Sequence, residues 1–129
     1  MSQLIKQNSK APSPCHCLNL RRASRVVTEF YERALEPSGL KVTQYSLLRS
    51  LEWVQPVRMS ELAKVIRIDR TTLNRTIKPL LKAELIEVNS GKDFRAKNLI
   101  LTQSGRETLR KAEELWREAQ ASLEDYLGA

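Results

Sequence analysis

The chain has 129 residues and a mass of 14.8 kDa, which fits one domain with its own hydrophobic core and hardly leaves room for two. Lysines and arginines number 22 against 15 aspartates and glutamates, so the net charge of +7 predicts an anionic partner, nucleic acid before membrane. An apolar run of about 18 residues is missing, which predicts no membrane span. The beginning of the chain lacks the apolar segment of a secretory signal. Two cysteines separated by one residue do not form a disulfide framework, which favours the reducing cytoplasm.

The helical pattern begins after a polar stretch. Residues 1–14 contain two prolines and show no periodicity, which predicts a mobile N-terminal arm, and residues 15–129 are expected to form a single domain. Apolar residues then recur every three or four positions, as on one face of a helix over about residues 17–36. The Pro-Ser-Gly sequence at 37–39 is expected to end this helix.

Three further helices are predicted before the chain turns to strands. Thr43 is a candidate N-cap for the second helix, whose apolar positions include Trp53. A short third helix is expected over about residues 60–66, and Asp69 is a candidate N-cap for a fourth. Pro79 lies inside the fourth helix, where it removes one backbone hydrogen bond and is expected to kink the turn.

A hairpin and a long helix complete the predicted fold. Residues 85–88 and 99–101 are typical of strands, and the turn-rich basic segment between them predicts an extended hairpin tip. Thr102 is a candidate cap for the last helix, over about residues 103–127, where apolar residues step by three and four as in a heptad seam. The expected fold class is therefore mainly α with a small β-hairpin.

The basic residues are concentrated in the middle of the chain. Residues 57–97 carry ten basic and five acidic side chains, whereas residues 98–129 have a net charge of −2. A short helix, a tight turn, a second helix and a basic hairpin, in that order, describe a winged helix-turn-helix over about residues 43–102. Such a fold places helix side chains against base edges, a hairpin arginine in a narrow minor groove and helix amides on phosphates. The predicted DNA-binding residues are Ser60, Arg70, Thr71, Thr72, Asn74, Arg75, Lys78, Lys92, Arg95 and Lys97. For any one of them alone, a solvated surface position is the alternative.

At this point the sequence resembles a known family. Residues 93–105 read D-F-R-A-K-N-L-I-L-T-Q-S-G, which is similar to the wing signature of the MarR family of transcriptional regulators: D-x-R, a short strand, then L-T-x-x-G. Residues 60–63 and 69–75 resemble the third helix and the recognition helix of that family. The resemblance covers about residues 18–127, which is nearly the whole chain.

The resemblance implies roles for two wing residues and a dimer. Arg95 is expected to enter the minor groove and Asp93 to orient it, and the family dimerises through its first and last helices. The heptad seam supports a dimer independently, because it offers more apolar surface than one short helix covers; packing against the first helix of the same chain is the alternative. The expected interface residues are Leu20, Leu109, Ala112, Trp116, Leu123 and Tyr126. A twofold dimer implies a pseudo-palindromic site with half-sites about 34–36 Å apart.

Cys15, His16 and Cys17 stand together where the arm meets the first helix. The cluster has three interpretations: structural, redox-active through thiols at a helix N-terminus, or metal-binding, although a fourth ligand is missing nearby. In the hydroperoxide-sensing branch of the family a reactive cysteine lies eight residues before an arginine of a Ser-Arg pair, as Cys17 does before Arg25. Of the tyrosines that assist that cysteine in that branch, only one has a counterpart here, Tyr31, while Arg21 and Val42 stand at the other positions. Because the two cysteines are too close in sequence for an easy mutual disulfide, a partner thiol or the other subunit is expected to be needed.

The expected function is a cytoplasmic, homodimeric, sequence-specific regulator that binds double-stranded DNA, most often a repressor in this family. The alternative is a winged-helix module for protein–protein assembly without sequence-specific DNA binding. An enzyme is not expected, since the sequence offers no nucleophile–base pair, glycine-rich phosphate loop or metal set, and no metal or other cofactor is predicted. The resemblance also implies a small-molecule effector, near Arg25, Tyr31, Trp53 and Trp116; core packing is the alternative role of these aromatic residues.

Overall fold

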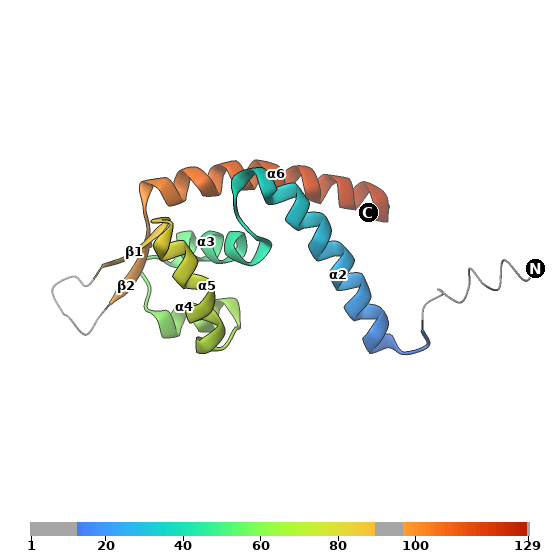
Figure 1. Ribbon diagram of the computed structural model, residues 1–129, viewed down its shortest axis with the longest axis horizontal. Helices are drawn as coiled ribbons and strands as arrows, with labels where there is room; N and C mark the ends of the chain where they lie inside the picture. Colours follow the sequence, from blue (N-terminus) through green and yellow to red (C-terminus); the bar gives the residue numbers. More distant parts are fainter. Residues whose placement is uncertain (1–12, 90–96, 129) are drawn as a thin grey trace, which may run out of the picture. The chain divides into compact units, whose positions relative to one another are not determined.

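The computed structural model describes residues 13–89 and 97–128 and is mainly helical with one antiparallel hairpin. Figure 1 shows the elements in chain order: α2 (His16–Leu35), η1 (Glu36–Ser38), α3 (Val42–Val54), α4 (Met59–Ile66), α5 (Arg70–Lys82), β1 (Ile86–Asn89), β2 (Asn98–Leu101) and α6 (Gln103–Leu127). This order confirms the predicted fold class. Most of the predicted N-terminal arm and the hairpin tip lie outside the described residues. The chain divides after Phe30 into two compact units. Within the described residues no helix is long and apolar enough to cross a lipid bilayer.

In the unit that ends at Phe30, the apolar face predicted for the first helix is exposed. Leu20 keeps 70% of its surface exposed and Val26 keeps 65%, while Leu18, Val27 and Phe30 are also exposed. Contiguous apolar surface of this kind usually marks a surface for association. The apolar periodicity of α2 was therefore a correct sign of a helix, but the described chain does not bury that face.

The unit that begins at Tyr31 has a leucine-rich core. Its fully buried side chains come from every layer of the unit: Leu35, Leu47, Leu48, Leu51, Leu62, Leu73, Leu80, Ile86 and Leu109. Figure 1 shows α6 running along α3, and Leu109 and Ala112 of α6 are buried in this core. Trp53 was predicted on the apolar side of the second helix, and that prediction is wrong: its side chain is 81% exposed, because it lies about 200° around the helix from the buried Leu51.

Helix ends follow the predicted caps at two of three positions. Asp69 caps α5 and Thr102 caps α6, and each side chain accepts a hydrogen bond from a backbone N–H of the first turn. The Thr43 cap is wrong, since the N-cap of α3 is Lys41, two residues earlier, and the helix begins at Val42. The Lys41 N–H donates to Oε1 of Gln44 at 2.9 Å, so the first turn of α3 is fixed by an amide that the sequence reading did not use.

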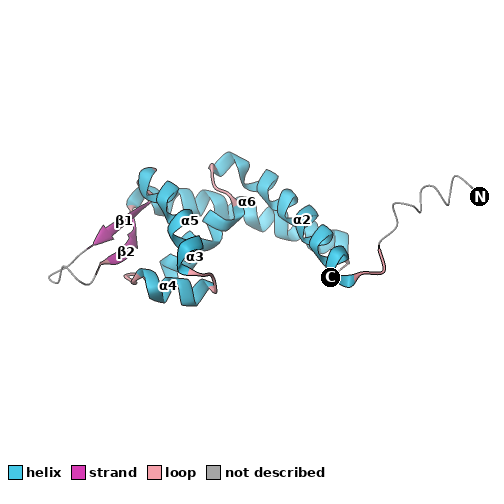
Figure 2. Ribbon diagram, turned by 60° about the horizontal axis from the view of Figure 1, so that its bottom comes forward, coloured by secondary structure: helices cyan, strands magenta, loops and turns pink. Residues whose placement is uncertain are grey.

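The wing strands lie within one residue of their predicted positions. β1 and β2 pair antiparallel, with Ile86 opposite Leu101 at the base of the hairpin, and Figure 2 shows them extending from the helices. The β1 strand begins at 86 rather than 85 because the Leu85 N–H still bonds to the Leu80 carbonyl and closes the end of α5. On its other edge β2 pairs with Val57, so the base of the hairpin is held from two sides.

Candidate nucleic-acid interface

Asp69 fixes the start of α5 in the position where a recognition helix begins. Its carboxylate accepts hydrogen bonds from the Thr72 N–H at 3.1 Å and from the Thr72 hydroxyl at 2.5 Å. The Thr72 hydroxyl and the Thr72 N–H hold the pKa of the Asp69 carboxyl below its ordinary value. The negative charge also stabilises the positive end of the helix dipole, so the first turn of α5 is well defined while its side chains remain in solvent.

One side of α5 presents the polar side chains predicted to read DNA. Arg70, Thr71, Asn74, Arg75 and Lys78 are all exposed. At 100° per residue they span an arc of about 140°, and the buried Leu73, Ile77 and Leu80 occupy a separate arc of about 60°. Three cations and two hydrogen-bonding side chains therefore share one solvent-facing surface, which is what a helix in the major groove requires.

Thr72 differs from the rest of the predicted set. Its hydroxyl donates to Asp69, and its side chain lines a cavity of about 190 Å³ together with residues of α3 and α4, including Leu47 and Ile66. Thr76 lines the same cavity, and its hydroxyl donates to the Thr72 carbonyl at 2.9 Å. Thr72 is also exposed, but its hydroxyl is engaged by Asp69, so it shapes the start of the helix.

The predicted phosphate-binding residues come from elements other than α5. Ser60 is exposed as the second residue of α4, a helix whose N-terminus receives no side-chain cap within the described residues. Lys97 is exposed immediately before β2. The remaining wing predictions, Lys92, Asp93 and Arg95, lie outside the described residues.

The contacts that anchor the wing to the helices were not predicted from the sequence. The Leu101 N–H donates to Oε1 of Gln55 at 2.8 Å, and Val57 and Leu99 exchange backbone hydrogen bonds of 2.8 and 3.3 Å. Gly105 packs against the Leu85 carbonyl so closely that a Cβ atom there would lie 2.0 Å from the oxygen. The glycine of the L-T-x-x-G sequence is thus needed for close approach between α6 and the start of the hairpin.

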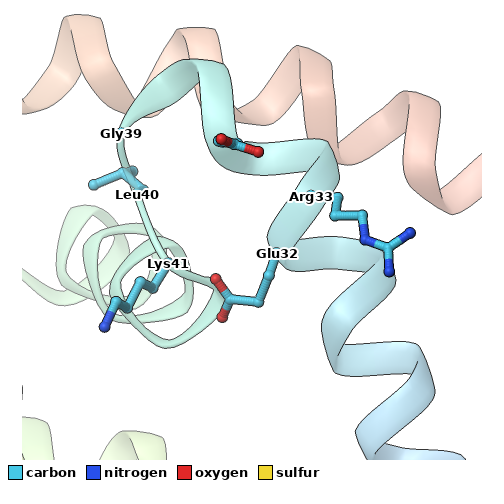
Figure 3. A pocket seen from close by; sticks show the side chains of 6 residues that line it. Glu32, Arg33, Gly39, Leu40 and Lys41 are labelled. Atoms are coloured by element: carbon cyan, nitrogen blue, oxygen red, sulfur yellow. The ribbon is translucent and has the colours of Figure 1, made fainter.

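A carboxylate links the end of α2 to the start of α3. Oε1 of Glu32 accepts a hydrogen bond of 3.1 Å from the Val42 N–H, the first amide of α3. Figure 3 shows the Glu32 carboxylate turned toward this segment, beside an open hollow of about 320 Å³. Side chains of both charge signs line the hollow, which is formed by Glu32, Arg33, Glu36, Gly39, Leu40 and Lys41.

The residues considered for other chemistry lie apart from α5 in sequence. Cys15 and Cys17 are exposed, Cys15 just before α2 and Cys17 in its first turn. Among the described residues no group of three histidines, cysteines or carboxylates could hold a metal ion. Trp116 is half-buried, stacks with Tyr45 at 6.2 Å between ring centroids, and carries the Arg49 guanidinium 4.9 Å from its ring centroid. Burial raises the pKa of the Tyr45 hydroxyl, and the positive charge of Arg49 partly opposes this effect.

Comparison with known proteins identifies the family. The family model described as MarR family matches residues 40–93, which include α3, α4, α5 and β1. The transcriptional regulator MosR of M. tuberculosis, crystallised in complex with DNA, is 42% identical; the match covers 86% of this chain and 81% of MosR, with a TM-score of 0.75. The chain belongs to the MarR family.

Two further relatives agree with this membership. The transcriptional repressor CouR, bound to a 23-mer DNA duplex, is 27% identical with a TM-score of 0.81, over 88% of this chain and 82% of CouR. The Bacillus subtilis protein YwoH, an uncharacterized HTH-type transcriptional regulator, is 29% identical over 96 residues, or 74% of this chain and 68% of YwoH. As a MarR-family protein the chain is a winged helix-turn-helix transcriptional regulator and not an enzyme, and these relatives do not favour the assembly-module alternative.

Proposed function

We propose that the chain is a homodimeric repressor that binds a pseudo-palindromic operator in double-stranded DNA. The observation that carries the proposal is the exposed polar side of α5, which is held at its N-terminus by the Asp69 cap within a MarR-family winged helix. The local charge is consistent with it, because residues 57–97 supply +5 of the total net charge of +7. This surface suits a polyanion, and the relatives in complex with DNA carry the same fold.

In this proposal α5 lies in the major groove and reads bases from its exposed side. Arg70 and Arg75 have the paired donors that recognise guanine, and Asn74 has the donor and acceptor that recognise adenine. Thr71 contacts a base edge or a thymine methyl group, and Lys78 binds phosphate further along the helix. Thr72 acts through Asp69 by fixing the first turn, so we assign it an indirect role.

The wing and α4 complete the DNA contacts. By resemblance to the family, Arg95 enters the minor groove and Asp93 orients it, while Lys92 and Lys97 bind flanking phosphates. Ser60 and the free amides of the first turn of α4 bind a further phosphate. Such contacts position the protein on the duplex, whereas the side chains of α5 select its sequence.

The dimer is proposed to form through exposed apolar surface on the first and last helices. Leu20 on α2 and Tyr126 at the end of α6 are 70% and 86% exposed, and Leu123 is half-buried. Leu109 and Ala112 lie in the core of their own chain, so they contribute to an interface only indirectly, by packing α6 against that core. Covering the exposed residues with a second copy removes apolar area from water, which stabilises association by about 25 cal/mol per Å².

Selection of bound duplexes from a random pool tests the proposal. We expect an enriched sequence with twofold symmetry and half-sites about 34–36 Å apart. With that duplex, Arg75→Ala should weaken binding by about 10- to 100-fold, as loss of one bidentate base contact does, and relax the preference at one base pair. Arg117→Ala, an exposed α6 arginine outside the proposed surface, is the matched control. Absence of any enriched sequence at low salt would refute sequence-specific binding and favour the assembly module.

A thiol switch is a second proposal, carried by the exposure of Cys15 and Cys17 at the start of α2. A thiolate there attacks the O–O bond of a hydroperoxide, which gives a sulfenic acid and releases the alcohol. Condensation with a thiol of the other subunit or of a small molecule then forms a disulfide and releases water. We expect hydroperoxide to weaken operator binding by the unmodified protein. If the Cys15→Ser/Cys17→Ser double variant responds to oxidant in the same way, the cysteines have a structural role.

A small-molecule effector and a cytoplasmic location complete the proposed function. Resemblance to the family supports the effector, and the cluster of Tyr45, Arg49 and Trp116 between α3 and α6 gives it aromatic and cationic groups to contact. Release of the selected duplex by a ligand that also quenches Trp116 fluorescence would support this assignment. A Trp116→Ala variant that releases the duplex at the same ligand concentration as the unmodified protein would place the ligand elsewhere.

A further inference from the structure

Two charged residues adopt a backbone conformation that normally belongs to glycine. Among the described residues, Gly39 and Gly128 have positive φ angles of 78° and 74°, and Arg67 and Glu84 have φ angles of 58° and 59°. The left-handed region is unfavourable for a residue with a Cβ atom, and glycine adopts it without that cost. The left-handed conformation of Arg67 and Glu84 therefore lowers the stability of the folded chain.

The two residues occupy the same position in the same helix-ending motif. Arg67 follows α4, where its N–H donates to the Lys64 carbonyl at 3.3 Å and the next N–H, of Ile68, donates to the Ala63 carbonyl at 3.1 Å. This pair of bonds defines a Schellman motif, whose left-handed residue is usually glycine. The turn needs only backbone atoms from position 67, so the motif gives no reason for an arginine side chain there.

Glu84 ends α5 with the same pair of bonds. Its N–H donates to the Leu81 carbonyl at 3.0 Å, and the N–H of Leu85 donates to the Leu80 carbonyl at 3.0 Å. Arg67 and Glu84 therefore have the same backbone strain. They differ in the sign of their charge and in their position relative to α5. Glu84 is an anion at the C-terminal end of α5, whereas Arg67 is a cation three residues before α5 begins.

Arg67 is free to bind an anion beside the start of α5. Its side chain is exposed, and within residues 13–89 and 97–128 it makes neither an ion pair nor a side-chain hydrogen bond. In a helix-turn-helix the first helix crosses the DNA backbone and the second helix enters the groove by its N-terminal end. The turn between them therefore faces phosphates, and a guanidinium binds phosphate through paired donors.

We propose that Arg67 is a DNA phosphate-binding residue, retained in a left-handed turn at a cost to stability because the contact with DNA requires its charge. This inference rests on the proposed function, and it adds a residue that charge counting and helix periodicity do not reveal. Arg67 sets the position of the helix-turn-helix on the backbone, while Arg70, Asn74 and Arg75 select the sequence.

Three substitutions separate the strain from the charge. Arg67→Gly removes both, so we expect the Tm to rise by about 3 °C and the affinity for the selected duplex to fall roughly tenfold. Arg67→Gln keeps the side chain and the strain but removes the charge, so the affinity should fall similarly while the Tm stays within about 1 °C. Glu84→Gly is the matched control, because it relieves the same strain in the same motif and should raise the Tm without weakening binding.

Salt dependence provides the second measurement. The slope of log affinity against log salt should become shallower by about 0.9 for each Arg67 that contacts a phosphate, in both position-67 variants and not in Glu84→Gly. Unchanged affinity and slope in both position-67 variants would overturn the role of Arg67 and leave the proposed function intact. Failure of the unmodified chain to bind any duplex at low salt would overturn the proposed function and the role of Arg67 with it.

Discussion

The junction between the wing and the last helix depends on the missing side chain of Gly105. A Cβ atom at this position would lie 2.0 Å from the Leu85 carbonyl oxygen, 3.0 Å from the carbonyl carbon and 3.4 Å from Cδ2 of Leu101. An ordinary carbon–oxygen contact is about 3.3 Å, so Gly105→Ala requires the start of α6 and the start of the hairpin to separate by about 1.3 Å. The atoms in conflict belong to the backbone, so a change of rotamer does not relieve it.

Two opposing effects determine the size of the change. Alanine is a better helix former than glycine by about 1 kcal/mol, so without a clash the substitution would stabilise α6. Overpacking costs about 1–3 kcal/mol. Separation also weakens the hydrogen bonds from Thr102 to the carbonyls of Leu85 and Glu84, now 3.1 and 2.6 Å, each worth about 1 kcal/mol. The net expectation is a loss of about 2 kcal/mol, or a fall in Tm of about 8 °C.

Urea and thermal unfolding measure this effect, with all variants compared at one fixed protein concentration because association also contributes to stability. Ser104→Ala is the control, because it makes an exposed alanine one position earlier in α6 and should change stability by less than about 0.5 kcal/mol. A Gly105→Ala variant as stable as the unmodified protein, or more stable, would refute the close-approach argument. It would show that helix propensity governs this position.

Three further changes test individual contacts of the described residues. Tyr45→Phe should change the free energy of unfolding in urea by less than about 1 kcal/mol, because the buried hydroxyl has no hydrogen bond of good geometry among the described residues and only a weak interaction with Arg49; a larger loss would mean that the interaction with Arg49 is strong. Glu32→Ala should cost about 1 kcal/mol by removing the acceptor of the Val42 N–H, whereas Glu32→Gln should cost only a few tenths; equal losses would mean that the charge, and not the hydrogen bond, matters. The lowered pKa of Asp69 means that its stabilising effect is present above about pH 4 and is lost as the pH falls through the folded-state pKa. The difference in Tm between the unmodified protein and Asp69→Asn should therefore shrink between about pH 6 and about pH 3, and a constant difference would contradict the cap.

Caps formed by nearby residues were predictable from the sequence, and caps formed by distant ones were not. Asp69 and Thr102 accept hydrogen bonds from amides three residues later, so the residue type and the local pattern were sufficient. Thr43 has the right chemistry for a cap, but the first amide of α3 is bound by Glu32, ten residues earlier and on another helix. A single sequence gives no signal for that pairing, because it depends on how the chain folds back.

The candidate DNA surface was predicted better than the parts that support it. Helical spacing placed Arg70, Asn74 and Arg75 on one exposed side because α5 is regular. The left-handed conformation of Arg67 was not predicted, because glycine is the usual residue at such a helix end and an arginine is typical of any exposed position. The hydrogen bond between Gln55 and Leu101 joins residues 46 positions apart, so no local sequence pattern predicts it.

The contacts of the unit from Tyr31 onward show how a change in the first helix would reach the DNA surface. The end of α2 is tied to α6 by the Tyr31 hydroxyl, which donates to Gln120 at 2.5 Å, and to α3 by Glu32. The α3 helix packs on α4 and α5 through the same leucine core, so the ends of the recognition helix follow α3 as a packed body. A signal that displaces residues 31–35 at the end of α2 therefore acts on these hydrogen bonds. Removing them by Tyr31→Phe and Glu32→Ala together should reduce the response of operator affinity to such a signal more than it reduces affinity itself.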